Sequence, residues 1–231
     1  MSLARAFLTT SQAIAHHYAM TPPNPTKEDT RYHKEEWWVL QIAPFIFRMH
    51  SILLWICASF ETITCLLALY SRPSSTLPSL ACPTNADSLR ATPLFLIGWL
   101  ALVLGAYIRL DCFRALGHLF TFDLTIHNDH KLITSGFYGY VRHPAYTGSL
   151  LLVAGITFSQ FTEGGWLTEC GPLHAVSPVI TAAISAAWWA WVLAVALSRV
   201  KAEDAEMKKQ FGQEWEKYAV EVPWWFFPGI A

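Results

Sequence analysis

Long apolar segments are the feature that most constrains this chain. A helix that crosses the hydrocarbon core of a bilayer needs roughly 20 mostly apolar residues. Segments 51–70, 93–108, 145–161 and 176–197 approach or meet that length. Charged residues make up only 14% of the 231 residues, whereas a soluble domain carries about 25%. We therefore predict an all-α integral membrane protein with about four to five transmembrane helices.

The first predicted span has two possible starting points. The segment from Trp37 to Phe47 is apolar and aromatic, so the helix can begin at Trp37 or Trp38. Pro44 then marks either a kink or the junction between an interfacial helix and the span. The remaining candidate, 51–70, carries Glu61 as its single charge.

The distribution of Lys and Arg indicates the orientation of the spans. Segments 1–50, 71–92, 109–143, 162–175 and 199–231 hold five, two, four, none and five of these residues. This alternation is what the positive-inside rule expects. We therefore predict that both termini and the 109–143 segment are cytosolic. Arg109, which closes the second span, is expected to extend its stem to the interface.

Charge and cysteine content exclude several classes of function. The formal net charge of −1 gives no electrostatic case for nucleic acid. The five cysteines form no CxxC pair and give no normal zinc spacing, so we predict no metal site. Cys82 and Cys170 fall on the same predicted side of the membrane, where a disulfide between them can form.

The segment from His130 to Gly148 concentrates polar groups at a membrane surface. Arg142 and His143 directly precede Pro144, a residue that suits the first turn of a helix. The unpaired N–H groups of a helix start favour anions, and the Arg142 guanidinium matches the geometry of a carboxylate. These residues either bind an anion-bearing ligand or anchor the helix at the interface.

A second polar cluster follows the last predicted span. Arg199 and Glu203 are four residues apart and share one face of a helix, whereas Asp204 is expected to point elsewhere. The cluster either contributes to a binding site or forms a surface ion pair worth at most about 1 kcal/mol. An apolar stripe continues along the same segment: Met207, Phe211, Trp215 and Tyr218.

The two clusters share a motif order with a known family. Gly-x-Tyr-x-x-x-Arg-His-Pro-x-Tyr-x-Gly is followed, after a span, by Arg-x-x-x-Glu-Asp, Phe-Gly, Tyr and Val-Pro. This order resembles the isoprenylcysteine carboxyl methyltransferase family over about residues 110–230. The motif residues are Gly136, Tyr138, Arg142, His143, Pro144, Tyr146, Gly148, Arg199, Glu203, Asp204, Phe211, Gly212, Tyr218, Val222 and Pro223. Trp215 stands where family members often have Tyr, and we expect the unusually aromatic tail 224–227 to be an interfacial anchor.

The resemblance implies a fold organisation and a reaction. Residues 1–50 are then a cytosolic and interfacial segment, and 51–110 a first transmembrane hairpin. Residues 111–231 form a methyltransferase core with two spans and a cytosolic, helical, cofactor-binding C-terminal region. The implied activity transfers a methyl group from S-adenosylmethionine to the C-terminal carboxylate of a prenylated cysteine or a similar lipid-like substrate. The implied location is the endoplasmic reticulum membrane, with substrate entering from the lipid.

The resemblance also implies roles for individual residues. Those expected to line the cofactor are His130, Lys131, Leu132, Ile133, Tyr138, His143, Pro144, Tyr146 and Glu203. Arg199 is expected to hold the substrate carboxylate, and the charge of Arg142 suits the carboxylate of the cofactor. A carboxylate is ionised near neutral pH, its usual pKa being below about 5, so no general base, metal or covalent intermediate is expected.

Three alternatives remain open at this stage. A phospholipid amine methyltransferase would use the same cofactor with a different nucleophile. Membrane sterol reductases that use NADPH carry a similar Arg-His-Pro-x-Tyr segment. The acidic pair followed by Phe211-Gly212, and the absence of an additional basic group for a 2′-phosphate, argue against a reductase. A non-catalytic membrane scaffold would tolerate the loss of Arg142 or Glu203.

Overall fold

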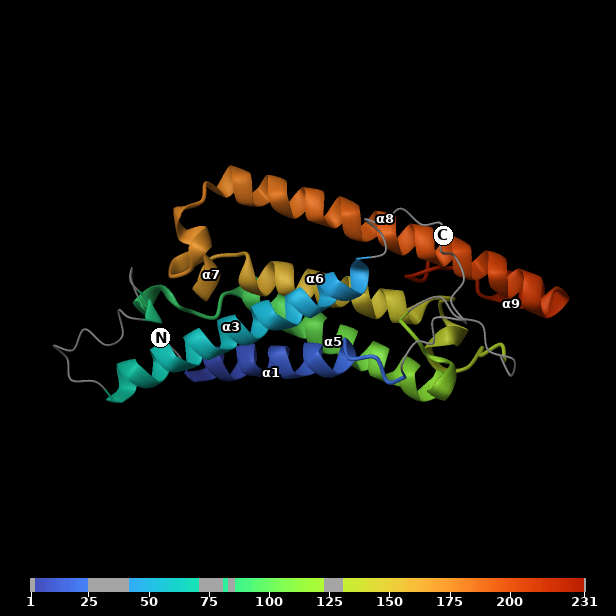
Figure 1. The fold of residues 1–231 in the computed structure, drawn as a ribbon, viewed down its shortest axis with the longest axis horizontal. Helices are drawn as coiled ribbons and strands as arrows, with labels where there is room; N and C mark the ends of the chain where they lie inside the picture. Colours follow the sequence, from blue (N-terminus) through green and yellow to red (C-terminus); the bar gives the residue numbers. More distant parts are fainter. Residues whose placement is uncertain (1–2, 25–41, 71–80, 83–85, 123–130, 231) are drawn as a thin grey trace.

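A computed structural model describes residues 3–24, 42–70, 81–82, 86–122 and 131–230. Within these ranges the regular secondary structure is helical, which confirms the predicted all-α class. Successive long helices run in opposite directions along an elongated bundle (Figure 1). The α-helices are α1 Leu3–Ala19, α3 Ala43–Tyr70, α5 Pro93–Leu116, α6 Pro144–Gln160, α7 Trp166–Glu169, α8 Pro178–Phe211 and α9 Gln213–Glu221.

Three of the described helices are long and apolar enough to cross a membrane, at Pro44–Tyr70, Pro93–Leu119 and Pro178–Phe211. The predicted span at 145–161 is present as α6, a shorter helix of 17 residues. Pro44 lies in the first turn of α3, where its missing N–H needs no helical partner. The alternative start at Trp37 or Trp38 falls outside the described residues.

Helix α8 is longer than the sequence predicted. It continues without interruption from the predicted span through Arg199 to Phe211, a total of 34 residues. At 1.5 Å per residue its length is about 51 Å, well beyond the roughly 30 Å of a hydrocarbon core. Gly212 ends it with a φ of 52°, a left-handed conformation that glycine adopts without strain. Arg199, Glu203 and Asp204 are therefore carried on the rigid extension of a membrane helix.

Close backbone contact between α5 and α6 fixes the position of α6. A Cβ atom added at Gly148 would lie 2.6 Å from Arg109 Cγ and 2.7 Å from the carbonyl oxygen of Gly105. At Gly155 the added atom would lie 2.7 Å from the carbonyl oxygen of Gly98. Small residues allow membrane helices to approach this closely. The motif glycine at 148 is therefore required where the Arg109 side chain crosses α6.

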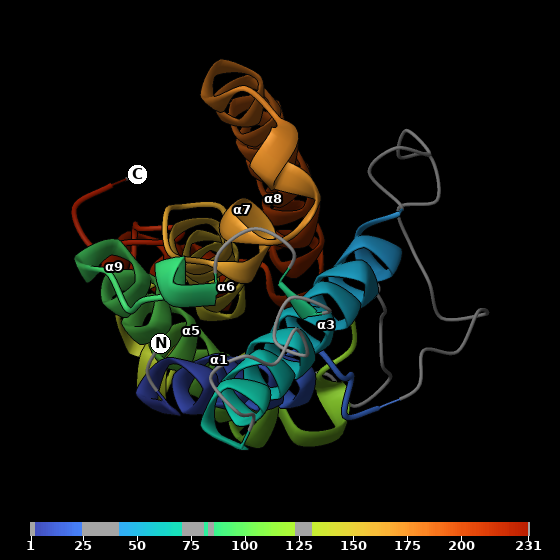
Figure 2. The same ribbon diagram turned by 90° about the vertical axis from the view of Figure 1, so that its left-hand side faces the viewer.

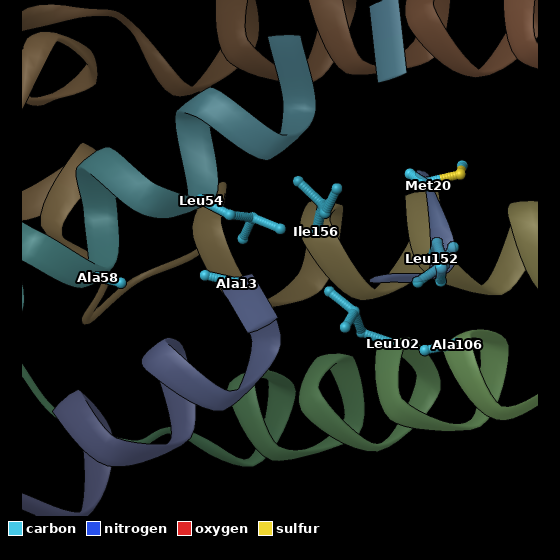
Figure 3. Packing of buried hydrophobic residues seen from close by; sticks show 9 residues of the cluster. Ala13, Met20, Leu54, Ala58, Leu102, Ala106, Leu152 and Ile156 are labelled. Carbon is cyan, nitrogen blue, oxygen red and sulfur yellow. The ribbon is translucent and has the colours of Figure 1, made fainter. Parts of the chain in front are cut away.

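Helix α1 was not predicted, because residues 1–50 were expected to be cytosolic and interfacial. It packs along the bundle, where Ala13 joins Leu54 of α3, Leu102 of α5 and Ile156 of α6 in one hydrophobic core (Figure 3). Its polar residues concealed this role. Arg5, Thr9, Gln12 and His16 recur at helical spacing and are all buried.

Glu61, the single charge of the predicted span 51–70, is neutralised by α1. Arg5 Nε lies 3.1 Å from Glu61 Oε1, and Thr9 Oγ1 donates to Glu61 Oε2 at 2.7 Å. Both members of the ion pair are 2% exposed. Buried charges require such partners, so α1 and α3 are matched through polar as well as apolar contacts.

The two ends of the bundle differ in chemistry. One end carries the beginning of α1, α7 and a disulfide between Cys82 and Cys170, while the other carries α9 (Figures 1 and 2). Leu3 and α9 therefore lie at opposite ends. The prediction that both termini are cytosolic counted α1 as part of a segment outside the membrane, and the orientation of the bundle stays a prediction.

Candidate active site

A cavity of about 230 Å³ lies at the α9 end of the bundle. Its walls come from the beginnings of α3 and α6, the end of α5, the stretch of α8 from Val192 to Met207, and α9. The polar and aromatic residues that line it include Arg109, Lys131, Tyr138, Arg142, His143, Tyr146, Ser149, Arg199, Glu203, Asp204, Trp215 and Tyr218.

Most of the residues predicted from the sequence lie around this one cavity. Those that line it are Lys131, Leu132, Ile133, Tyr138, Arg142, His143, Tyr146, Arg199 and Glu203. Pro144 is not among the lining residues and instead begins α6. His130 lies outside the described residues. The individual binding roles of all these residues remain predictions.

His143 is held between two carboxylates of α8. Its Nδ1 lies 3.2 Å from Glu203 Oε2, and its Nε2 lies 2.8 Å from Asp204 Oδ1. Because each ring nitrogen faces an acceptor, the arrangement favours the imidazolium, in which both nitrogens donate. Burial alone would lower the pKa of His143. The hydrogen bonds to Asp204 and Glu203, with the charges of these two groups, outweigh burial and raise that pKa to about 9.

Asp204 takes part in the site, which corrects the prediction that it points elsewhere. In addition to His143, it pairs with Arg142 Nη2 at 3.3 Å and accepts from Trp225 Nε1 at 2.9 Å. Adjacent residues on a helix project in different directions. Both Glu203 and Asp204 can nevertheless reach His143, because the imidazole ring lies between them with one nitrogen toward each.

Tyrosine hydroxyl groups complete the hydrogen bonding around the acidic pair. Tyr146 donates to Glu203 Oε1 at 2.5 Å, and Tyr218 donates to the carbonyl oxygen of Tyr138 at 2.8 Å. Burial raises the pKa values of Tyr138 and Tyr218 above their ordinary range. These residues are therefore neutral donors at physiological pH and add no negative charge to the site.

The guanidinium groups of Arg142 and Arg199 each have a buried Nε with unused hydrogen-bonding capacity. Arg199 donates through Nη1 to the carbonyl oxygen of Phe122 at 2.9 Å, and the Arg142 guanidinium lies 5.7 Å from the Trp215 ring centroid. Within the described part of the chain, the buried Nε atoms of Arg142 and Arg199 have no hydrogen-bond partner. Buried donors are normally satisfied, so both atoms suit oxygen atoms of a bound anion.

Arg109 is a lining residue whose position was wrongly predicted. Instead of reaching the interface it is 6% exposed, and it donates to the carbonyl oxygens of Ala19 and Ala145 and to Ser149 Oγ, at 2.8, 3.2 and 2.7 Å. Its guanidinium also lies 4.9 Å from the Phe122 ring centroid. Charged residues in membrane helices usually face the bundle interior, and this tendency was the signal available in the sequence.

The aromatic tail, which was predicted to be an interfacial anchor, also packs on the site. The backbone N–H groups of Arg142 and His143 donate to the carbonyl oxygens of Trp224 and Trp225 at 2.9 and 3.0 Å. Thr147 Oγ1 donates to the carbonyl oxygen of Phe226 at 2.5 Å. These contacts bridge about 80 residues of sequence and depend largely on backbone groups, so no local motif indicated them.

The cavity also has an apolar wall. Phe47 at the beginning of α3, Leu150 of α6, and Val192, Val195 and Ala196 of α8 line it. Charged groups and an apolar wall therefore border the same space. Among the described residues, no three His, Cys, Asp or Glu side chains are arranged to hold a metal ion.

Comparisons with known proteins agree with the motif order. The model of the isoprenylcysteine carboxyl methyltransferase family matches residues 96–162. A probable protein-S-isoprenylcysteine O-methyltransferase of Oryza sativa subsp. indica is 30% identical over 128 residues, 54% of this chain and 57% of the relative. Protein-S-isoprenylcysteine O-methyltransferase B of Arabidopsis thaliana is 27% identical over 128 residues, 54% and 55% of the two chains.

A third relative, whose name gives the same activity, also matches about half of the chain. Protein-S-isoprenylcysteine O-methyltransferase of Schizosaccharomyces pombe is 28% identical over 124 residues, which are 53% of this chain and 44% of the relative. The chain thus spans about half the length of the curated relatives it matches. The predicted resemblance to the isoprenylcysteine carboxyl methyltransferase family is confirmed, and the comparisons support neither alternative enzyme.

Proposed function

We propose that this chain is a membrane methyltransferase that transfers a methyl group from S-adenosylmethionine to the C-terminal carboxylate of a prenylated cysteine. The observation that carries the proposal is one cavity with two kinds of wall. Arg142 and Arg199 present buried Nε atoms that have no hydrogen-bond partner among the described residues, while Leu150 and Val192 belong to an apolar surface on the same space. A prenylated C-terminus combines a carboxylate with a hydrocarbon chain and therefore matches both walls.

The cavity residues fit S-adenosylmethionine, whose sulfonium supplies an activated methyl group. Arg142 Nε suits the carboxylate of the amino acid moiety, because this buried cation has a donor to spare. The Glu203 carboxylate accepts hydrogen bonds from Tyr146 and His143 but retains acceptor capacity for an ammonium or hydroxyl group. We assign the lining residues 131–133 and Tyr138 to the same ligand.

Arg199 is proposed to hold the substrate carboxylate. The carboxylate oxygen forms the new bond to the methyl carbon, the carbon–sulfur bond breaks, and its electron pair stays on sulfur. The products are a methyl ester and S-adenosylhomocysteine. Because the nucleophile is already ionised, this chain needs to align the reacting atoms and exclude water. Arg199, fixed by the Phe122 carbonyl oxygen, can orient the carboxylate.

We propose that the site faces the cytosol. The Lys and Arg pattern places segments 109–143 and 199–231 on the cytosolic side. The Cys82–Cys170 bond lies at the opposite end, and disulfides persist in oxidising compartments. This orientation places α6 in the bilayer beside the three long apolar helices, in the endoplasmic reticulum membrane that the family resemblance implies. The beginning of α1 then lies on the non-cytosolic side.

Calorimetric binding of S-adenosylhomocysteine to the detergent-purified protein tests the cofactor. We expect micromolar affinity, lost in Glu203→Ala and retained in Glu221→Ala. The second change removes an exposed carboxylate of α9 that pairs only loosely with Lys217, at 4.0 Å. A folded protein that binds NADPH but not S-adenosylhomocysteine would overturn the proposal in favour of a reductase, and one that binds neither would indicate a scaffold.

A further inference from the structure

The carboxylate of Asp204 has three partners on two segments of the chain, the start of α6 and the C-terminal tail. Oδ1 lies 2.8 Å from His143 Nε2, at the beginning of α6. Oδ2 lies 3.3 Å from Arg142 Nη2 and accepts the indole N–H of Trp225 at 2.9 Å. The indole has a single N–H and no acceptor, so in this contact Trp225 must donate and Asp204 must accept. Trp225 thus fixes the oxygen that also faces the Arg142 guanidinium.

Trp225 and its neighbour Trp224 also hold the backbone of the same two site residues. The N–H of His143 donates to the carbonyl oxygen of Trp225 at 3.0 Å, and the N–H of Arg142 donates to that of Trp224 at 2.9 Å. Trp225, Asp204 and His143 therefore form a closed ring of contacts. The ring runs from indole to carboxylate to imidazole, and from the His143 backbone to the Trp225 carbonyl.

The tail is itself fixed to the bundle. Thr147 donates to the Phe226 carbonyl oxygen at 2.5 Å. Phe226 and Phe227 pack against the buried cluster formed by Leu150, Val153 and Val192. An anchored segment can position a partner, because its own atoms have little freedom to follow that partner.

We propose that Trp225 is a positioning residue of the site, whose indole N–H fixes the Asp204 carboxylate and, through it, the Arg142 guanidinium and the His143 ring. This inference deepens the proposed function and rests on it for its ligand. Arg142 and His143 line the cavity, so a displaced Asp204 changes the cationic wall that meets the cofactor carboxylate. No atom of Trp225 needs to touch the ligand for this effect.

The test compares two substitutions that make the same chemical change. Trp225→Phe removes the indole N–H and keeps an aromatic ring. Trp166→Phe is the matched control, because it removes an N–H bonded at the same distance, 2.9 Å, to the Ala81 carbonyl oxygen at the other end of the bundle. Trp225→His restores a ring N–H and is the conservative rescue variant.

Two readouts separate positioning from general stability. The dissociation constant of S-adenosylhomocysteine should rise about tenfold in Trp225→Phe, the usual size of one hydrogen bond to a charged group. It should be unchanged in Trp166→Phe and partly restored in Trp225→His. The NMR titration of His143, assigned with His143→Gln, should move to lower pH in Trp225→Phe and stay unchanged in Trp166→Phe. The titratable groups facing this ring are Glu203, Asp204 and Tyr146, and Arg142 pairs with the Asp204 carboxylate beside it.

Asp204→Glu is the second variant, and it keeps the proposal testable if Trp225→Phe does not fold. It retains the charge but displaces the carboxylate by one methylene, so we expect the same weaker binding and the same displaced titration. Unchanged affinity and an unchanged His143 titration in folded Trp225→Phe or Asp204→Glu would overturn the positioning role. If the wild type does not bind S-adenosylhomocysteine, the proposed function fails, while the His143 titration still decides the role of Trp225.

Discussion

Substituting alanine for Gly148 tests how the start of α6 is held. The added Cβ would lie 2.6 Å from Arg109 Cγ and 2.7 Å from the Gly105 carbonyl oxygen. The second neighbour is backbone, so α5 and α6 must separate by about 0.7 Å or more to reach ordinary contact distance. Arg109 also holds Ala145 and Ser149 in the first turns of α6, and this separation strains those hydrogen bonds.

The expected cost is that of an overpacked core, about 1–3 kcal/mol. For a chain of this size that cost lowers the melting temperature by roughly 2–12 °C, at about 2–4 °C per kcal/mol. Because α6 carries His143 and Tyr146, the affinity for S-adenosylhomocysteine should fall as well. Thermal unfolding followed by tryptophan fluorescence, together with calorimetry in the same detergent, measures both effects.

Gly139→Ala is the matched control for this substitution. A Cβ there meets only the Thr134 carbonyl oxygen at 3.4 Å, an ordinary contact distance, and the position has no positive φ. Its melting temperature should stay near that of the wild type. If Gly148→Ala is as stable and binds as tightly as Gly139→Ala, the close approach of α5 and α6 does not determine the site.

Three further predictions concern charge and covalent structure. The pKa of His143 is raised from 6.5 to about 9, so the stabilisation from its ion pairs is complete below about pH 6.5 and is lost as pH rises through 9. Calorimetry across this range should show weaker S-adenosylhomocysteine binding above pH 9. Constant affinity up to pH 10 would contradict this prediction. Glu61→Gln removes the carboxylate charge that faces the buried guanidinium of Arg5 and should destabilise the protein by about 3–5 kcal/mol in denaturation measurements. Glu163→Gln, in an exposed pair with Arg90, should change stability by less than about 1 kcal/mol. Thiol labelling under denaturing conditions should modify three cysteines before reduction and all five after it, because Cys82 and Cys170 are bonded and three others are free. Five labelled thiols without reduction would exclude the disulfide.

The sequence was most informative where apolar length and motif order are local properties. The spans at 51–70 and 93–108 lie within the observed helices α3 and α5, since sustained apolar length leaves a chain in lipid no other structure. The motif order likewise brought Arg142, His143 and Glu203 to one cavity.

The errors arose where partners are distant in sequence. Helix α1 was missed because a charged residue such as Arg5 suggests a solvent-exposed segment, and the sequence does not show that Glu61 lies beside it. Asp204 was predicted to point away from the site because its helical spacing from Arg199 differs from that of Glu203. That spacing does not show that the His143 imidazole lies between Glu203 and Asp204 and contacts both. Backbone pairing of Trp225 with His143 has no side-chain pattern to reveal it.

The central claim is tested most directly by methyl transfer from labelled S-adenosylmethionine to a farnesylated cysteine peptide with a free C-terminus. The carboxyl reaction predicts a product that releases labelled methanol in base, and no product from the same peptide ending in an amide. Arg199→Ala should abolish this transfer, whereas Lys201→Ala, an exposed cation on the same helix, should retain it. A base-stable methylated product, or equal transfer to the amide, would contradict the account and indicate a different nucleophile.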